Sequence, residues 1–146
     1  MPENTSGARK HTVLELASNL DSVDQAEAAA MESAANVGFD EDSRHDVGMA
    51  VRESMVNAVA HGNRYNARKK VRFQVWERAD GVVIEIEDEG KGFDMSDVPD
   101  PRAEDNVLRH SGRGLLMIRA YMDEFEIGRR EPAGTRVRMA KYLRSE

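Results

Sequence analysis

Residues 52–63, "RESMVNAVAHGN", place Glu53 and Asn57 four positions apart in a segment otherwise rich in Met, Val and Ala. Successive residues of an α-helix are about 100° apart, so these two side chains share one face of the predicted helix. The opposite side carries the predicted core stripe, which consists of Val51, Met55 and Ala58. A polar pair in this setting is either an ordinary solvated surface or the half-buried wall of a pocket. Taken alone, the pair favours the solvated surface.

The next two segments alternate between apolar and polar residues, as strands do. Their apolar positions are Val71, Phe73 and Val75 in "KVRFQVWE" and Val82, Ile84 and Ile86 in "VVIEIED". The intervening "RADG" predicts that the two strands form a hairpin. Asp88 continues the alternation on the inward face, where a carboxylate must be hydrogen-bonded or paired. It either caps the following turn or accepts a hydrogen bond from a ligand held in a pocket.

Glycines recur at three later points of the chain. Gly90 and Gly92 in "DEGKGF" have the spacing of a tight turn close to something bulky. Two glycines in "SGRGLLMI" open a predicted helix, whose backbone N–H groups and positive dipole end are suited to binding phosphate. Gly134 and Thr135 lie in a predicted closing hairpin with its turn at "EPAG". Each of these features has an ordinary structural explanation when it is taken singly.

The wider chain predicts one α+β domain, a two-layer sandwich with helices on one face of a mostly antiparallel sheet. The segment 11–17 is the expected first strand, with Val13 inward and either Leu14 or Leu16 inward as well. A helix capped by Asp21 and ended by Gly38 should follow. A second helix runs from about residue 40 to Gly62 and Asn63, and a third begins after Gly114. The domain is assigned to residues 11–146, after a flexible tail at 1–10.

Composition narrows the possible functions. The chain has 146 residues and a net charge of −6, which disfavours general nucleic-acid binding because phosphate neutralisation needs excess Lys and Arg. It has no cysteine, which excludes disulfides and thiolate metal sites. Its polar N-terminus is not a secretory signal, and no apolar run approaches the roughly 20 residues of a membrane span. A cytoplasmic protein that contacts neither membrane nor nucleic acid directly is therefore expected.

The order and separation of these motifs resemble those of the GHKL ATPases. More narrowly, "ESMVNAVAHG", "DEGKGF", "GRGLLMI" with "YMDEFEI", and "GTRVRMAKYL" resemble the bacterial anti-sigma factor serine kinases. The resemblance covers the chain from Val13 to Leu143. It implies the Bergerat fold, ATP and Mg²⁺ as cofactors, and transfer of phosphate to a protein serine. The absence of the G-x-x-x-x-G-K-[ST] spacing excludes a P-loop nucleotidase.

The resemblance also implies roles for residues of the helix and the first hairpin. Glu53 would be the base that orients and deprotonates the attacking hydroxyl group, and Asn57 would bind Mg²⁺ through its side-chain oxygen. Asp88 would accept a hydrogen bond from the exocyclic amine of adenine. Gly90 and Gly92 would let the backbone pass close to the nucleotide.

The remaining implied roles concern the phosphates and the adenine end of the nucleotide. Residues 93–113, which show no steady period, would form the ATP lid. Gly112, Arg113 and Gly114 would close this lid over the phosphates. Thr135 would support the adenine end from the last hairpin. The sequence leaves the individual role of Arg113 open, because its side chain either reaches a phosphate or faces solvent.

The implied biological role is that of an anti-sigma factor with serine kinase activity. Its partners would be a STAS-domain anti-sigma factor antagonist, phosphorylated on serine, and a sigma factor that it sequesters. A homodimer is also implied. The alternative is a non-catalytic ATP-binding module that grips a partner without transferring phosphate. Glu53 and Asn57 favour the enzyme, since a pure binding module need not keep either residue; His61, just after them, has no assigned role.

Overall fold

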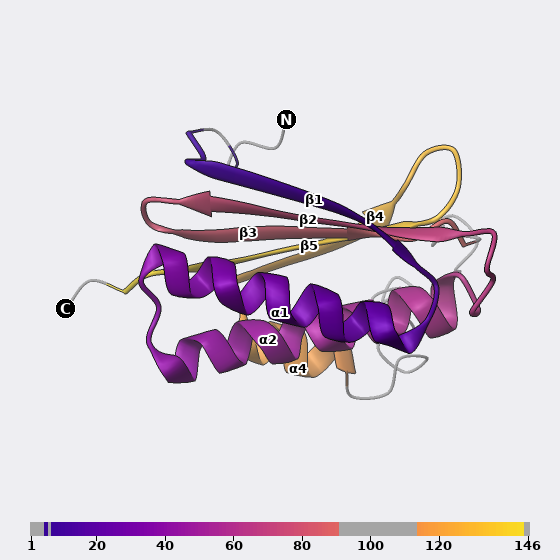
Figure 1. The fold of residues 1–146 in the computed structure, drawn as a ribbon. Coiled ribbons are helices and arrows are strands. Elements are labelled where there is room, and N and C mark those ends of the chain that lie inside the picture. Colours follow the sequence, from indigo (N-terminus) through magenta and orange to yellow (C-terminus); the bar gives the residue numbers. More distant parts are fainter. Residues whose placement is uncertain (1–4, 6, 91–113, 145–146) are drawn as a thin grey trace, which may run out of the picture.

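The computed structural model describes residues 5, 7–90 and 114–144, and the strands and helices form two layers (Figure 1). In chain order the elements are β1 (Lys10–Ala17), α1 (Leu20–Val37), α2 (Glu41–Val56), η2 (Asn57–Gly62), β2 (Lys70–Arg78), β3 (Gly81–Glu87), α4 (Gly114–Tyr121), β4 (Glu124–Arg129) and β5 (Thr135–Tyr142). The helices α1, α2 and α4 lie against one face of the sheet. The predicted α+β, two-layer sandwich is confirmed.

Within the described residues the sheet has five strands in the order β1-β2-β3-β5-β4, and every neighbouring pair is antiparallel. The two predicted hairpins, β2–β3 and β4–β5, are confirmed. Because β5 returns beside β3, the strands β1 and β4 form the two edges of the sheet. The strands β2, β3 and β5 are central. Asp88 was expected on the face of these strands that points toward the helices.

The prediction that Val13 faces the core is wrong, because the register of β1 places the even-numbered residues inward. Leu14 pairs with Phe73 and Leu16 with Val71, both of which are buried. Val13 lies on the other face and is 41% exposed, whereas Leu16 is 6% exposed. A shift of one residue exchanges the two faces of a strand, and short alternation alone did not fix which set pairs with β2.

The helix ends follow local chemistry, with one change from prediction. Asn19, not Asp21, is the N-cap of α1, and its side-chain oxygen accepts a hydrogen bond from the Ser22 N–H. Asp21 instead lies in the first turn, where a carboxylate complements the helix dipole. Gly38 ends α1 as predicted, with φ of 114°, a left-handed conformation that favours glycine.

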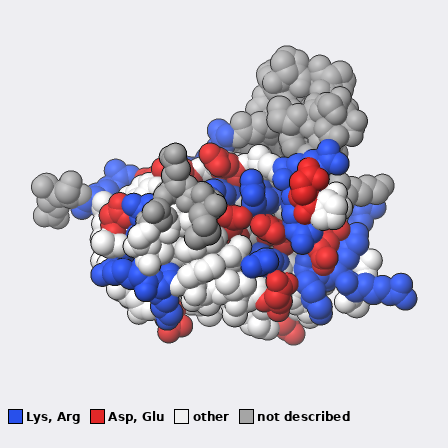
Figure 2. Space-filling view, turned by 90° about the horizontal axis from the view of Figure 1, so that it is seen from above, with Lys and Arg blue, Asp and Glu red and all other residues white. Residues whose placement is uncertain are grey.

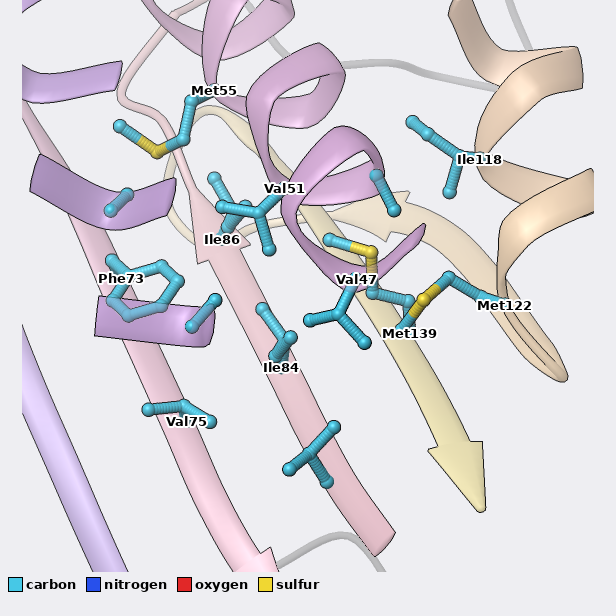
Figure 3. Close-up of a cluster of buried hydrophobic side chains, with 14 of the residues drawn as sticks. Val47, Val51, Met55, Phe73, Val75, Ile84, Ile86, Ile118, Met122 and Met139 are labelled. Atoms are coloured by element: carbon cyan, nitrogen blue, oxygen red, sulfur yellow. The ribbon is translucent and has the colours of Figure 1, made fainter. Parts of the chain in front are cut away.

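The core lies between α2 and the sheet (Figure 3). Val47, Val51 and Met55 of α2 are fully buried, and Ala58 is 4% exposed, so the predicted core stripe is confirmed. These side chains pack over a sheet surface formed by Phe73, Val75, Ile84, Ile86 and Met139. Ile118 and Met122 close the core from the side of α4. This packing fixes the orientation of α2 about its own axis, and so determines where the side chains on its opposite face lie.

The outer face of the sheet is held by charge pairs across the strands. Arg72 Nε lies 3.9 Å from Glu15 Oε1, and Arg138 Nη1 lies 3.6 Å from Glu85 Oε2. Seen from this side, Lys and Arg alternate with Asp and Glu (Figure 2). A small apolar cluster on the same face consists of Trp76, Val83 and Ala140. Within the described ranges, no helix is both long enough and apolar enough to span a bilayer.

Candidate nucleotide site

The helix that carries Glu53 and Asn57 changes its winding at Asn57. The α-helical segment ends at Val56, and residues 57–62 continue as a π-helical turn. The Asn63 N–H donates to Ala58 O, 2.8 Å away, as the wider winding requires. Such turns are frequent at functional sites, because they displace the following residues from the regular helix path. The predicted end of the helix at Gly62 and Asn63 is confirmed.

Glu53 and Asn57 lie on one face, joined by a hydrogen bond from the Asn57 N–H to the Glu53 carbonyl. Both residues are half-buried, which distinguishes them from a freely solvated surface pair. Among the described residues, Glu53 has no hydrogen bond or ion pair through its carboxylate. The Nδ2 atom of Asn57 is buried and likewise finds no partner. The described part of the fold therefore makes no use of these two polar groups.

Asp88 is buried at the end of β3, as the strand alternation predicted, and is 5% exposed. Its Oδ1 atom accepts hydrogen bonds from the Gly90 N–H at 3.0 Å and the Thr135 N–H at 3.2 Å. Its own N–H donates to Thr135 O at 3.0 Å. No described residue donates a hydrogen bond to Oδ2. The carboxylate is thus fixed through one oxygen and keeps the other as an acceptor.

Burial is the main influence on the ionisation of Asp88. It raises the pKa of the carboxyl group above its usual value, because a charge is less well solvated in the protein than in water. The hydrogen bonds from Gly90 and Thr135, and the positive charges of Arg130 and Lys69, act in the opposite direction. The net shift is upward. A ligand that donates a hydrogen bond to this carboxylate would offset part of the cost of its burial.

Three glycines allow three chain segments to close around Asp88. A Cβ atom on Gly62 would lie 2.3 Å from Asp88 Oδ2, and one on Gly134 would lie 1.9 Å from Asp88 O. A Cβ atom on Gly90 would lie 2.2 Å from Gly62 O. Any side chain at these positions would push apart η2, the loop after β3 and the β4–β5 hairpin. The sequence predicted a close backbone approach at Gly90, but gave Gly62 only the role of a helix end.

Asn63 is a site residue that the sequence did not reveal. It is 1% exposed, and its Nδ2 atom donates to Ser18 Oγ at 2.9 Å and to Lys70 O at 3.0 Å. Its Oδ1 atom accepts from the Glu89 N–H at 2.7 Å. The only signal in the sequence was a Gly-Asn helix terminus, which usually marks a solvated loop.

The structure brings together a part of the predicted site. Asp88, Gly90 and Thr135 meet at one point, and η2 packs against them through Gly62. Gly114 is the first residue of α4, which packs against α2. Gly92, Gly112 and Arg113 lie outside the described residues, as does the predicted lid at 93–113. His61 is exposed in the last turn of η2.

No cluster of three or more His, Cys, Asp or Glu side chains suited to a metal ion occurs in the described parts of the chain. A metal held by fewer protein side chains takes its other ligands from a bound molecule and from water. That arrangement is the usual one for Mg²⁺, which binds phosphates through few protein groups.

The match to a known family covers most of the chain. A sequence model of the histidine kinase-like ATPase domain matches residues 16–141. This protein therefore belongs to the histidine kinase-like ATPase domain family, as its resemblance to the GHKL ATPases predicted.

Two similar proteins come from bacteria. The chain is 31% identical over 121 residues to the serine-protein kinase RsbW of Bacillus subtilis, covering 77% of this chain and 73% of that protein. It is 36% identical over 103 residues to an anti-sigma F factor of Clostridium botulinum, covering 68% and 71%.

A solved structure shares the fold. The RsbU and RsbW domains of a protein from Mycobacterium tuberculosis superimpose with a TM-score of 0.62 at 19% identity. The match covers 93% of this chain, which spans 33% of that longer one. At this identity the likeness concerns the fold alone.

Proposed function

We propose that this protein is an anti-sigma factor with ATP-dependent serine kinase activity. It phosphorylates a serine of a STAS-domain anti-sigma factor antagonist and sequesters a sigma factor. The observation that carries the proposal is the buried Asp88 carboxylate, fixed through Oδ1 and unpartnered at Oδ2 among the described residues. The names of the relatives, serine-protein kinase RsbW and anti-sigma F factor, support the reaction and the partners.

In the proposed complex Asp88 recognises the base. Its Oδ2 atom accepts a hydrogen bond from the exocyclic amine of adenine, while backbone N–H groups hold Oδ1. Thr135 supports the same end of the nucleotide from the start of β5, and Gly90 gives the close backbone approach that a planar base requires. Gly92, Gly112, Arg113 and Gly114 are assigned to the lid over the phosphates.

Glu53 and Asn57 are assigned to the reacting end of the nucleotide. The Nδ2 atom of the Asn57 amide is buried and has no partner among the described residues. The oxygen of the same amide is the proposed Mg²⁺ ligand, since amide oxygens are suitable ligands for this ion. When bound, Mg²⁺ neutralises charge on the phosphate oxygens. Glu53 accepts the proton of the substrate serine as its Oγ bonds to the γ-phosphorus. The bond from that phosphorus to the β–γ bridging oxygen breaks, and ADP leaves.

A homodimer is also proposed, joined through the first strand and helix. The strand β1 is an edge of the sheet and carries Val13 with 41% of its surface exposed. An edge strand with an exposed apolar side chain is suited to pairing with a second chain.

Calorimetry of ATP with and without Mg²⁺ tests the proposed site. We expect the wild-type protein to bind ATP more tightly when Mg²⁺ is present. Asn57→Ala should lose this advantage, by about tenfold to a hundredfold, because the metal loses its protein ligand. Asn36→Ala, which changes an exposed asparagine of α1, is the matched control and should bind as wild type does. Equal affinities with and without Mg²⁺ in the wild-type protein would contradict the metal assignment.

A methyl group added at Gly62 should damage the base-binding end of the site. Gly62→Ala directs a Cβ atom at Asp88 Oδ2, at a separation of 2.3 Å, so the carboxylate must move. Overpacking of this kind costs about 1–3 kcal/mol. We expect calorimetry to show an ATP affinity lowered about tenfold or more. Gly48→Ala is the control, because its Cβ atom comes closest to the flexible side chain of Met31 and meets Glu27 Cγ only at 3.5 Å, an ordinary van der Waals separation. Unchanged affinity in both variants would contradict the assignment of Asp88.

A further inference from the structure

The Asn63 side chain forms more hydrogen bonds than a residue at a helix terminus needs. Its amide nitrogen donates twice, to Ser18 Oγ and to Lys70 O, and its amide oxygen accepts from the Glu89 N–H. The side chain is 1% exposed, so water does not replace these partners. A buried amide with both ends satisfied holds its neighbours in one arrangement.

Asn63 connects the segment after β1 and the segment after β3, both distant from it in the sequence, with the start of β2, seven residues further along. Ser18 follows β1, Asn63 follows η2, Lys70 begins β2, and Glu89 follows Asp88. Two further bonds tighten the group: Ser18 Oγ donates to Lys69 O at 2.6 Å, and the Lys70 N–H donates to Glu89 Oε2 at 2.5 Å. The backbone at Glu89 is therefore held through both its N–H and its side chain.

Glu89 is the residue through which Asn63 acts on the site. It lies between Asp88 and Gly90, and the Gly90 N–H is one of the two donors that hold Asp88 Oδ1. Asn63 fixes the peptide bond between Asp88 and Glu89, and the Gly90 N–H belongs to the next peptide bond, so Asn63 restricts the direction of this donor through Glu89. Gly62, the residue before Asn63, lies against Asp88 Oδ2. One buried side chain therefore sets the position of the backbone on both sides of the carboxylate.

We propose that Asn63 is a positioning residue that determines the selectivity of this protein for adenine. It holds the Glu89 peptide and Gly62 so that Asp88 presents its unpartnered oxygen to the 6-amino group of the base. This inference rests on the proposed function, because it requires Asp88 to bind adenine. Asparagine suits the position because it combines two N–H donors with an acceptor. Aspartate would lose both donors and bury a second charge close to Asp88.

The test compares ATP with purine riboside 5′-triphosphate, which lacks only the 6-amino group. Calorimetry measures both affinities in the wild-type protein, in Asn63→Ala and in Val47→Ala. Wild type should prefer ATP by about tenfold to a hundredfold, the usual value of a hydrogen bond to a charged group. Asn63→Ala should reduce this preference to about threefold or less, because Asp88 is no longer held in place. Val47→Ala removes buried core volume in α2 without touching the Asn63 bonds, and should keep the wild-type preference.

A second variant covers the case in which Asn63→Ala does not fold. Ser18→Ala removes a single acceptor of the Asn63 amide and should lower the preference for ATP about threefold. A wild-type preference retained in both the Asn63 and the Ser18 variants would overturn the positioning role while leaving the adenine assignment intact. If wild type itself binds the two triphosphates equally, the assignment of Asp88 fails, and the role of Asn63 fails with it.

Discussion

Replacement of Glu53 by glutamine is expected to lower the rate of serine phosphorylation by about 10²- to 10⁴-fold, the usual contribution of a positioned base. Glutamine keeps the shape of the side chain but cannot accept the proton of the attacking hydroxyl group. ATP binding should be preserved, because the proposed contacts to adenine and metal belong to Asp88 and Asn57. Transfer of labelled γ-phosphate to the antagonist protein, with ATP affinity measured in parallel, separates the two effects.

Glu32→Gln is the control for this experiment. Glu32 is an exposed carboxylate of α1, so its replacement changes the net charge equally without touching the site. It should retain the wild-type rate. Full activity of Glu53→Gln would remove Glu53 from the mechanism and leave the proton to another acceptor. Transfer that is absent in the wild-type protein as well would favour the non-catalytic binding module.

Replacement of Asp88 by asparagine is expected to weaken ATP binding by at least about 10²-fold while the fold is retained. The asparagine oxygen can still accept from the backbone N–H groups of Gly90 and Thr135. Its amide nitrogen then replaces Oδ2, so an N–H group faces the exocyclic amine of adenine, which is also a donor, and no hydrogen bond forms between them. Calorimetry measures the loss, and Asp42→Asn, an exposed position in the first turn of α2, should bind ATP normally.

The same substitution should change how stability depends on pH. Burial raises the pKa of Asp88 in the folded protein above its ordinary value of 3.8. This group therefore contributes stability that is fully present below the unfolded pKa and is lost as pH rises through the folded pKa. Asparagine does not titrate. The free energy of unfolding of Asp88→Asn should therefore rise relative to that of wild type as pH rises from the unfolded to the folded pKa of Asp88. Parallel urea titrations at a series of pH values that begins below the ordinary aspartate pKa of 3.8 check it; a constant difference would contradict the upward shift.

Regular alternation allowed most of the sheet to be predicted. Phe73, Ile84 and Ile86 are buried as their spacing indicated, because β2 and β3 are long, rich in β-branched residues and joined by a tight turn. Val13 was misplaced because β1 is an edge strand with apolar residues on both faces, so its pattern fits either register. Asn19 and Asp21 are both good capping residues, and only the backbone geometry distinguishes them.

The candidate site was partly predictable for a related reason. Asp88 continues a strand whose inward face was already known, so its burial followed from position alone. Gly62 and Asn63 carry no such pattern. Their importance arises from contacts with Asp88, Glu89 and Ser18, which are distant in the chain and meet only after the sheet has formed. Sequence spacing alone did not reveal these contacts between distant segments.

The closure of the last hairpin over Asp88 has a consequence for synthesis of the protein. Thr135 and Gly134 lie against Asp88, and β5 lies between β3 and β4 in the sheet. Under the proposed assignment of Asp88 to adenine, a nascent chain on the ribosome cannot bind ATP until β5 has emerged and paired. A ligand stabilises only a state that binds it, so under this assignment cellular ATP would protect the finished domain and give no protection to a chain truncated before this strand.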